Sequence, residues 1–244
     1  MKILGIDTAT QILNLAIIEN SKVIYDYRMN KEGTTHSGTL IPFIENIINF
    51  AGFKLCQLDG IATAIGPGSF TGLRIGLASA KGLAFALSIP LIGVNTLEAY
   101  ALQWKDLPGT LCPIIKARKD EYYFTIYQKS KRNNRLIKKV EYQCKKWIDI
   151  KEQLLMFETP FFIFGYGIED VFQENISSKN FKDKYIILKK EEPPGASYIA
   201  LIGEDRIIKN KYDDMYALSP FYICKSAAER NKYSANNKGL QNEK

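Results

Sequence analysis

The order of apolar and polar positions along the chain predicts a first α/β unit built from a strand meander followed by helices. Short apolar runs bounded by turn residues indicate strands, and apolar residues recurring at three and four residue spacing indicate helices. The expected strands are 2–8, 11–19, 22–28, 58–65 and 89–94, and the expected helices are 36–50, 72–87 and 96–104.

The same order of elements starts again after Pro108, without visible sequence identity. Strands are expected at 111–116, 121–129, 136–143, 160–164 and 219–224, and helices from Ile168 and over 196–209. Because this period is about half of the chain, it predicts two similar lobes, residues 1–107 and 108–224, and not a solenoid. From residue 225 the chain turns polar, so residues 225–244 are predicted to be disordered.

Composition narrows the class of protein. With 46% hydrophobic and 24% charged residues, the chain has ordinary globular composition. Its apolar runs are too short to span a bilayer and its first residues lack the features of a signal peptide, so we expect a cytoplasmic protein without membrane contact. The four cysteines are far apart, which favours reduced thiols over a zinc ribbon or a disulfide scaffold.

The most distinctive segment is the loop from Gly66 to Gly72, which follows a predicted strand and precedes a predicted helix. Such a junction can hold an anion on free backbone N–H groups. It lacks the lysine of a P-loop, and Thr71 stands where a dinucleotide fingerprint needs a third glycine. Two interpretations stay open: a stiff turn with Ser69 or Thr71 capping the helix, or weak nucleotide binding by Asp7, Thr8, Gly66, Pro67, Gly68 and Ser69.

Residues 59–100 carry a family resemblance. The string Gly66-Pro67-Gly68-Ser69-Phe70-Thr71-Gly72-Leu73-Arg74-Ile75-Gly76, supported by Ile6-Asp7-Thr8, His36-Ser37 and Lys116-Ala117-Arg118, resembles the TsaB (YeaZ-type) family. These are bacterial partner proteins in threonylcarbamoyladenosine modification of tRNA. The resemblance spans about residues 2–224 and is loose beyond Lys129.

The resemblance implies an actin-like, ribonuclease H-like fold of two similar lobes, each a mixed sheet flanked by helices. It also implies a scaffold or activator that is itself not an enzyme. Such a protein forms a homodimer when alone and a heterodimer with the catalytic subunit TsaD, with the ATPase TsaE as a third member. Contact with tRNA through the complex, and ATP or ADP in the complex, are left open.

TsaD carries two histidines four residues apart that bind a metal, and Thr96 and Tyr100 stand at the matching positions here. A hydroxyl and a phenol are poor ligands when unionised, so neither Mg nor Zn/Fe is expected on this chain, and no cofactor. The one histidine, His36, lacks a nucleophile motif beside it, which leaves no candidate catalytic residue. An alternative function is an independent ATP-binding or ATP-hydrolysing protein of the superfold that uses Asp7.

The helices at 36–50 and 72–87 are the predicted interface. Each looks apolar over a wider arc of its surface than a single contact with the core requires. A charged residue at Ile44 or Gly76 is therefore predicted to abolish dimerisation and TsaD binding. The residues expected to contact a partner are His36, Leu40, Phe43, Ile44, Ile47, Gly72, Arg74, Gly76 and Ala80.

The chain has a net charge of +7, and nine of its lysines and arginines lie between Lys129 and Lys151. Tyr142 and Trp147 are interleaved with them. A solvated hairpin surface is one interpretation of this stretch, and a patch that faces tRNA is the other. A stand-alone RNA-binding protein is a third and weaker functional hypothesis, since it depends on this stretch alone.

Overall fold

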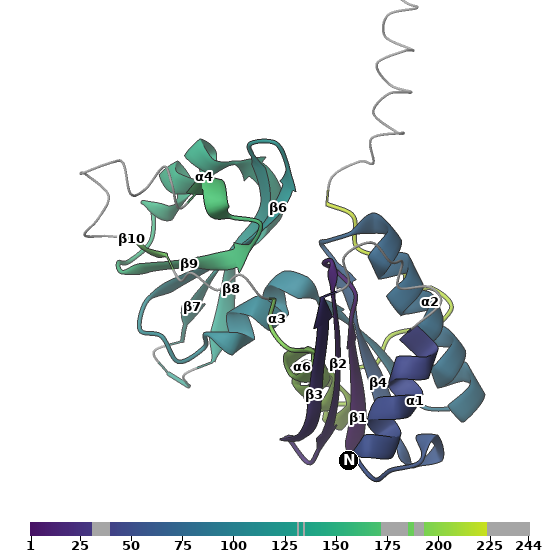
Figure 1. Ribbon diagram of the computed structural model, residues 1–244. Coiled ribbons are helices and arrows are strands. Elements are labelled where there is room, and N and C mark those ends of the chain that lie inside the picture. The colour runs from purple at the N-terminus through teal and green to yellow at the C-terminus, as the bar shows by residue number, and fades with distance from the viewer. Residues whose placement is uncertain (31–39, 131, 134, 172–184, 188–192, 224–244) are drawn as a thin grey trace, which may run out of the picture.

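The computed structural model describes residues 1–30, 40–130, 132–133, 135–171, 185–187 and 193–223. They form two lobes, each built on a five-stranded sheet, with helix α3 between them (Figure 1). His36, predicted to lie at an interface, and the tail 225–244 fall outside the described residues.

The first sheet has the strand order β3-β2-β1-β4-β5. Strands β1 to β3 pair antiparallel, whereas β4 and β5 continue the sheet in parallel. The carboxyl ends of β1, β4 and β5 therefore share one edge, where Asp7, Gly66 and Asn95 lie. The elements of this lobe are β1 (Lys2–Asp7), β2 (Ile12–Glu19), β3 (Lys22–Asn30), α1 (Leu40–Phe50), η2 (Leu55–Gln57), β4 (Gly60–Gly66), α2 (Phe70–Leu87), β5 (Leu91–Asn95) and α3 (Thr96–Gln103).

The second sheet repeats this connectivity in the order β10-β9-β6-β7-β8. Again three strands form an antiparallel meander and two continue in parallel. A meander extended by two parallel strands, occurring twice, is the ribonuclease H-like topology of the actin-like superfold, so the expected fold class is confirmed. The elements are β6 (Thr110–Arg118), β7 (Glu121–Lys129), β8 (Leu136–Lys146), α4 (Trp147–Leu154), β9 (Phe161–Tyr166) and β10 (Tyr185–Ile187).

Helix α6 (Ala196–Ile208) follows the second sheet in the chain but packs on the first (Figure 1). It covers the face of that sheet opposite α1 and α2, and small residues let it approach closely. A Cβ on Gly5 would lie 2.3 Å from the carbonyl oxygen of Ala196, and one on Gly203 2.4 Å from Cβ of Ala62. The predicted boundary at residues 107 and 108 separates the two sheets, but α6 belongs spatially to the first lobe.

Some elements differ from the sequence-based expectation. Helix α4 was not expected, because its apolar residues Trp147, Ile150 and Leu154 directly follow the lysine-rich end of β8, although their spacing is helical. Helix α2 begins at Phe70, since Ser69 caps it by accepting a hydrogen bond from the N–H of Gly72. The prediction of a strand at 219–224 is wrong for the described residues 219–223, which form an irregular segment. In this segment the N–H of Phe221 donates a hydrogen bond to the carbonyl of Ile65 at 2.7 Å.

Candidate functional site

The glycine loop lies at the carboxyl edge of the first sheet and packs against Thr8 and Ala9. Gly66 has φ +114°, a conformation that favours glycine. A Cβ on Gly68 would lie 2.3 Å from the carbonyl oxygen of Ala9, and that oxygen accepts a hydrogen bond from the N–H of Ser69 at 2.6 Å. The N–H groups of Ser69 and Gly72 are thus bonded within the loop and its neighbour, so neither is free to hold a phosphate.

Asp7, at the end of β1, is fully buried. Burial raises the pKa of its carboxyl to about 6, although the N–H of Ala9, which donates to Oδ1 at 2.8 Å, and the side chain of Asn14 lower it in part. The neighbouring Thr8 donates its hydroxyl to the carbonyl of Gly72 at 2.8 Å. The residues predicted to bind nucleotide are therefore brought together, but they pack on one another.

Thr96 and Tyr100, which the family resemblance matched to the TsaD metal ligands, lie on α3 and are buried. Their hydroxyls make no hydrogen bond within the described part of the chain. Burial, and next the nearby carboxylate of Asp7, raise the pKa of Tyr100 well above its ordinary value, so the phenol stays neutral. A neutral phenol and an alcohol do not fit a divalent metal, and the described residues hold no group of three His, Cys, Asp or Glu suited to one.

Six of the predicted interface residues face the interior of their own lobe. Leu40, Ile44 and Ile47 are buried in the core between α1 and the first sheet. Phe43 is half-buried and stacks on Tyr27 with ring centroids 5.6 Å apart. Gly72, Gly76 and Ala80 are buried as well, and the two glycines face Thr8 of the loop after β1. The six buried residues are therefore engaged within the lobe, and the exposed residues of the same helices replace them as candidates for partner contact.

The outer face of α2 carries an exposed apolar seam that the sequence analysis missed. The seam consists of Thr71, Ile75, Ala78, Gly82 and Phe85, which alternate at four and three residue spacing. Ile75 is half-buried against the core of the lobe, and the other four residues are exposed. Phe85 is 65% exposed, and a Cβ on Gly82 would meet nothing within 4 Å. This is the spacing of the core positions of a coiled coil, a signal that could have been found in the sequence.

Arg74 is exposed beside this seam, at the first turns of α2. Its guanidinium lies over the ring of Phe70 at 3.7 Å, and its Nε donates to the hydroxyl of Tyr222 at 3.0 Å. Phe70 and Tyr222 also stack with ring centroids 5.2 Å apart. Tyr222, in the segment after α6, thus holds Arg74 at one end of the α2 seam. Because Arg74 is exposed there, it remains a candidate for partner contact.

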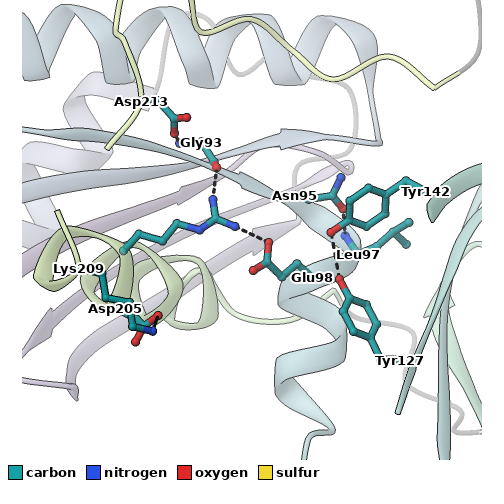
Figure 2. A network of polar contacts seen from close by, with 10 residues as sticks. Gly93, Asn95, Leu97, Glu98, Tyr127, Tyr142, Asp205, Lys209 and Asp213 are labelled. Carbon is teal, nitrogen blue, oxygen red and sulfur yellow. Dashed lines mark hydrogen bonds and ion pairs between the residues drawn. The ribbon is translucent and has the colours of Figure 1, made fainter. Parts of the chain in front are cut away.

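A polar network links α6 to the junction of β5 and α3 (Figure 2). Arg206 donates to the carbonyl of Gly93 at 2.8 Å and to Glu98 at 2.6 Å, while Asp213 accepts from the N–H of Gly93 at 2.8 Å. Sequence reasoning missed this network, because each of its hydrogen bonds joins residues more than a hundred positions apart and no motif marks them.

Beside the network a cavity of about 550 Å³ opens between the two lobes. Its wall on the second lobe includes Tyr127 and Tyr142, whose hydroxyls lie 3.0 Å apart (Figure 2). Burial, partly offset by its bond to Tyr127, raises the pKa of Tyr142 to about 12, so both phenols stay neutral near pH 7.

Comparison with known proteins places the chain in a family. A family model described as TsaD, tRNA N6-adenosine threonylcarbamoyltransferase, matches residues 30–229. The tRNA threonylcarbamoyladenosine biosynthesis protein TsaB of Bacillus subtilis (strain 168) is 29% identical over 232 residues, which cover 94% of this chain and 96% of that protein. The TsaB protein of Escherichia coli (strain K12) is 35% identical over 131 residues, 53% of this chain and 56% of that protein.

The chain belongs to the TsaB family. The structure of YeaZ from Pseudomonas aeruginosa is similar in fold to this TsaB-family chain, with a TM-score of 0.69, 21% identity, and coverage of 91% of this chain and 100% of that one. The family resemblance expected from the glycine loop is confirmed. Within the described residues of this TsaB-family chain, no helix is long and apolar enough to cross a bilayer.

Proposed function

We propose that this TsaB-family chain is a non-catalytic subunit that binds and stabilises a TsaD-type catalytic subunit in tRNA threonylcarbamoyladenosine formation. The exposed seam of α2 carries the proposal. It forms the contact with TsaD, and when the chain is alone it forms a homodimer, as expected from the resemblance. TsaE acts as the third member of the assembly.

The seam supports a helix partner by its chemistry. Exposed apolar residues on one helix face are stabilised when a second apolar face covers them. Ala78 and Gly82 at its centre present almost no side chain, so a partner helix can approach closely, while Phe85 at one end offers a large apolar contact. Aromatic and arginine side chains dominate the binding energy of many interfaces, and Phe85 and Arg74 fit that role.

Helix α1 contributes less than expected to this surface. Its outward positions Glu45, Asn46 and Asn49 are polar, and only its ends expose large apolar side chains, with Ile41 45% and Phe50 75% exposed. The proposed contact surface is therefore the seam of α2, and the exposed ends of α1 lie at its border.

The catalytically silent role is supported by the remnant cleft. Asp7 is sealed within the lobe, the loop N–H groups of Ser69 and Gly72 are bonded internally, and Thr96 and Tyr100 replace a metal-binding histidine pair. In this proposal the chain holds no resident metal or nucleotide, and all chemistry takes place on the partner.

Substitution on the seam tests the proposal without disturbing the fold. In Ala78→Glu and Phe85→Glu a carboxylate would be buried in the interface, which costs several kcal/mol, so we expect TsaD affinity to fall by about 30-fold or more. Isothermal titration with TsaD and the elution volume of the isolated chain measure the two contacts. Met156→Glu is the matched control, because Met156 is 80% exposed in the second lobe. Unchanged TsaD affinity in both seam variants would contradict the proposal.

Charged substitutions at Ile44 or Gly76 cannot test the interface. Ile44 is 1% exposed, and a Cβ on Gly76 would lie 2.2 Å from Oγ1 of Thr8. A charged residue at either position would disrupt the lobe itself, so loss of binding would not report on an interface.

A second measurement separates the subunit role from an independent ATPase. The purified chain should show no ATP turnover, whereas its addition to TsaD and TsaE, supplied with the activated threonylcarbamoyl donor, should switch on tRNA modification. Robust hydrolysis by the chain alone would favour the ATPase alternative.

A further inference from the structure

The basic stretch between Lys129 and Lys151 does not form one patch. Strand β8 is pleated and irregular in register against β7, so neighbouring lysines point to different surfaces. Lys138 lines the cavity between the lobes, whereas Lys139 lines a separate cavity of about 480 Å³. Lys151 is 7% exposed, with its ammonium 5.7 Å from the ring of Trp147, and is not part of an open surface.

The second cavity lies where the β7–β8 ribbon meets the starts of β6 and β9. Three cationic side chains surround it against a single acidic one, and two hydroxyl groups complete a set of donors suited to an anion. These residues are Lys129, Arg132, Lys139, Glu158, Ser130 and Thr159.

The three cations of this cavity outnumber its one carboxylate, that of Glu158. Among the residues that the structure describes, Arg132 and Lys139 have no ion-pair partner. Lys129 reaches Asp106 only at 3.8 Å, and the side chain of Asp106 is 84% exposed, so solvent screens this pair. An anion that entered would therefore meet two unpaired cations and a weakly paired third.

We propose that this cavity, which we call the hairpin-base pocket, binds the phosphodiester backbone of RNA. Lysine, arginine and hydroxyl groups are the usual partners of phosphate oxygens, whereas reading of single-stranded bases needs aromatic faces. The lining of the hairpin-base pocket contains no aromatic residue among those described. The choice of RNA over another phosphate source rests on the proposed function in tRNA modification.

The position of the pocket suits a subunit that binds RNA and protein at once. The pocket belongs to the second lobe, and the α2 seam belongs to the first. An RNA contact at the hairpin-base pocket therefore leaves α2 free for TsaD.

Binding of a fluorescein-labelled tRNA transcript to the isolated full chain, measured by anisotropy as a function of salt, tests the proposal. In the double variant Arg132→Glu/Lys139→Glu we expect affinity at low salt to fall about tenfold or more. The slope of log K against log salt should become shallower by about 1 to 2, because two phosphate contacts are lost.

The matched control is Lys22→Glu/Lys119→Glu, which makes the same change in net charge at exposed lysines outside the pocket. Affinity should stay within about twofold of the unaltered chain, because in this proposal neither lysine neutralises an RNA phosphate. An equal loss in both double variants would overturn the proposal, as would an absence of tRNA binding by the unaltered chain at low salt. Displacement of the tRNA by millimolar inorganic phosphate at constant ionic strength would assign the pocket to a free phosphate and would also overturn it.

The outcome is separable from that of the proposed function. Ala78→Glu and Phe85→Glu should keep full tRNA affinity, and the pocket double variant should keep full TsaD affinity. Loss of one activity without the other shows which of the two surfaces has been wrongly assigned.

Discussion

The side chain of Thr8 occupies the space in which a side chain on Gly76 would begin. A Cβ at position 76 would lie only 2.2 Å from Oγ1 of Thr8, and the same hydroxyl donates to the carbonyl of Gly72 at 2.8 Å. The small residues of α2 thus let the helix lie directly on the loop after β1, and the opposite face of the helix is left to solvent.

Gly76→Ala should lower the free energy of unfolding by about 1–2 kcal/mol, because the overlap with Thr8 outweighs the better helix propensity of alanine. Thr8→Ala removes the obstructing hydroxyl, so Thr8→Ala/Gly76→Ala should be more stable than the sum of the two single changes predicts. Urea unfolding of the four proteins measures this coupling. Additive effects would show that Thr8 is not what excludes a side chain at position 76. Gly82→Ala, on the exposed face, is the control and should stabilise slightly.

Stability should depend on pH through Asp7. Its pKa is raised from 3.8 to about 6 in the folded chain, so from about pH 4 to pH 6 the unfolded chain releases a proton that the folded chain retains. The free energy of unfolding is therefore not lowered by Asp7 below about pH 4. It falls as the pH rises from about 4 to about 6, and above that the loss stays constant. The full penalty is about 3 kcal/mol.

Asp7→Asn mimics the protonated acid and removes this penalty. The variant should gain stability over the unaltered chain progressively between pH 4 and pH 6, with a constant gain at pH 7 and above. Denaturant unfolding at several pH values measures the difference. A gain that does not vary with pH would contradict the raised pKa.

The ion pair between Arg206 and Glu98 should contribute more to stability than an exposed pair on the same helix. Both of its side chains are 30% exposed, and Arg206 also donates to the carbonyl of Gly93 (Figure 2). Arg206→Ala should lower the free energy of unfolding by about 2 kcal/mol, since it leaves a carbonyl and a carboxylate without their donor.

Lys209 and Asp205 provide the comparison, because they form an i,i+4 pair whose side chains are 42% and 61% exposed. Lys209→Ala should cost about 0.5 kcal/mol or less. If both alanine variants lose equal stability in thermal or urea unfolding, the network between α6 and α3 has no special role.

Local sequence patterns were sufficient to predict the two lobes and most of their helices and strands. The meanders and the helix after the glycine loop follow from residue periodicity and turn residues, and Ser69 acts as the cap that its position suggests. Helix α4 was missed because the lysines that precede it suggested a solvated hairpin, while the packing of Trp147 and Ile150 into the second core decides its structure.

The candidate sites were harder to predict, because they depend on which face of an element is covered. The small residues at 72, 76 and 80 suggested a contact with a partner, yet they face the loop after β1 and the core of their own lobe. The seam residues 78, 82 and 85 are exposed only because no other described element of the lobe covers them. Likewise, neighbouring lysines 138 and 139 cannot be assigned to different cavities without the register of β8.

The return of α6 to the first sheet has a consequence for how the chain matures on the ribosome. The second lobe is a continuous insertion that can assemble as soon as its strands emerge, whereas the first lobe must wait for residues 196–208. Until then one face of its sheet, including Ile3, Ala62 and Ile92, lacks its cover and presents an apolar surface to chaperones and to other nascent chains. The lobe that begins first in synthesis is therefore completed last.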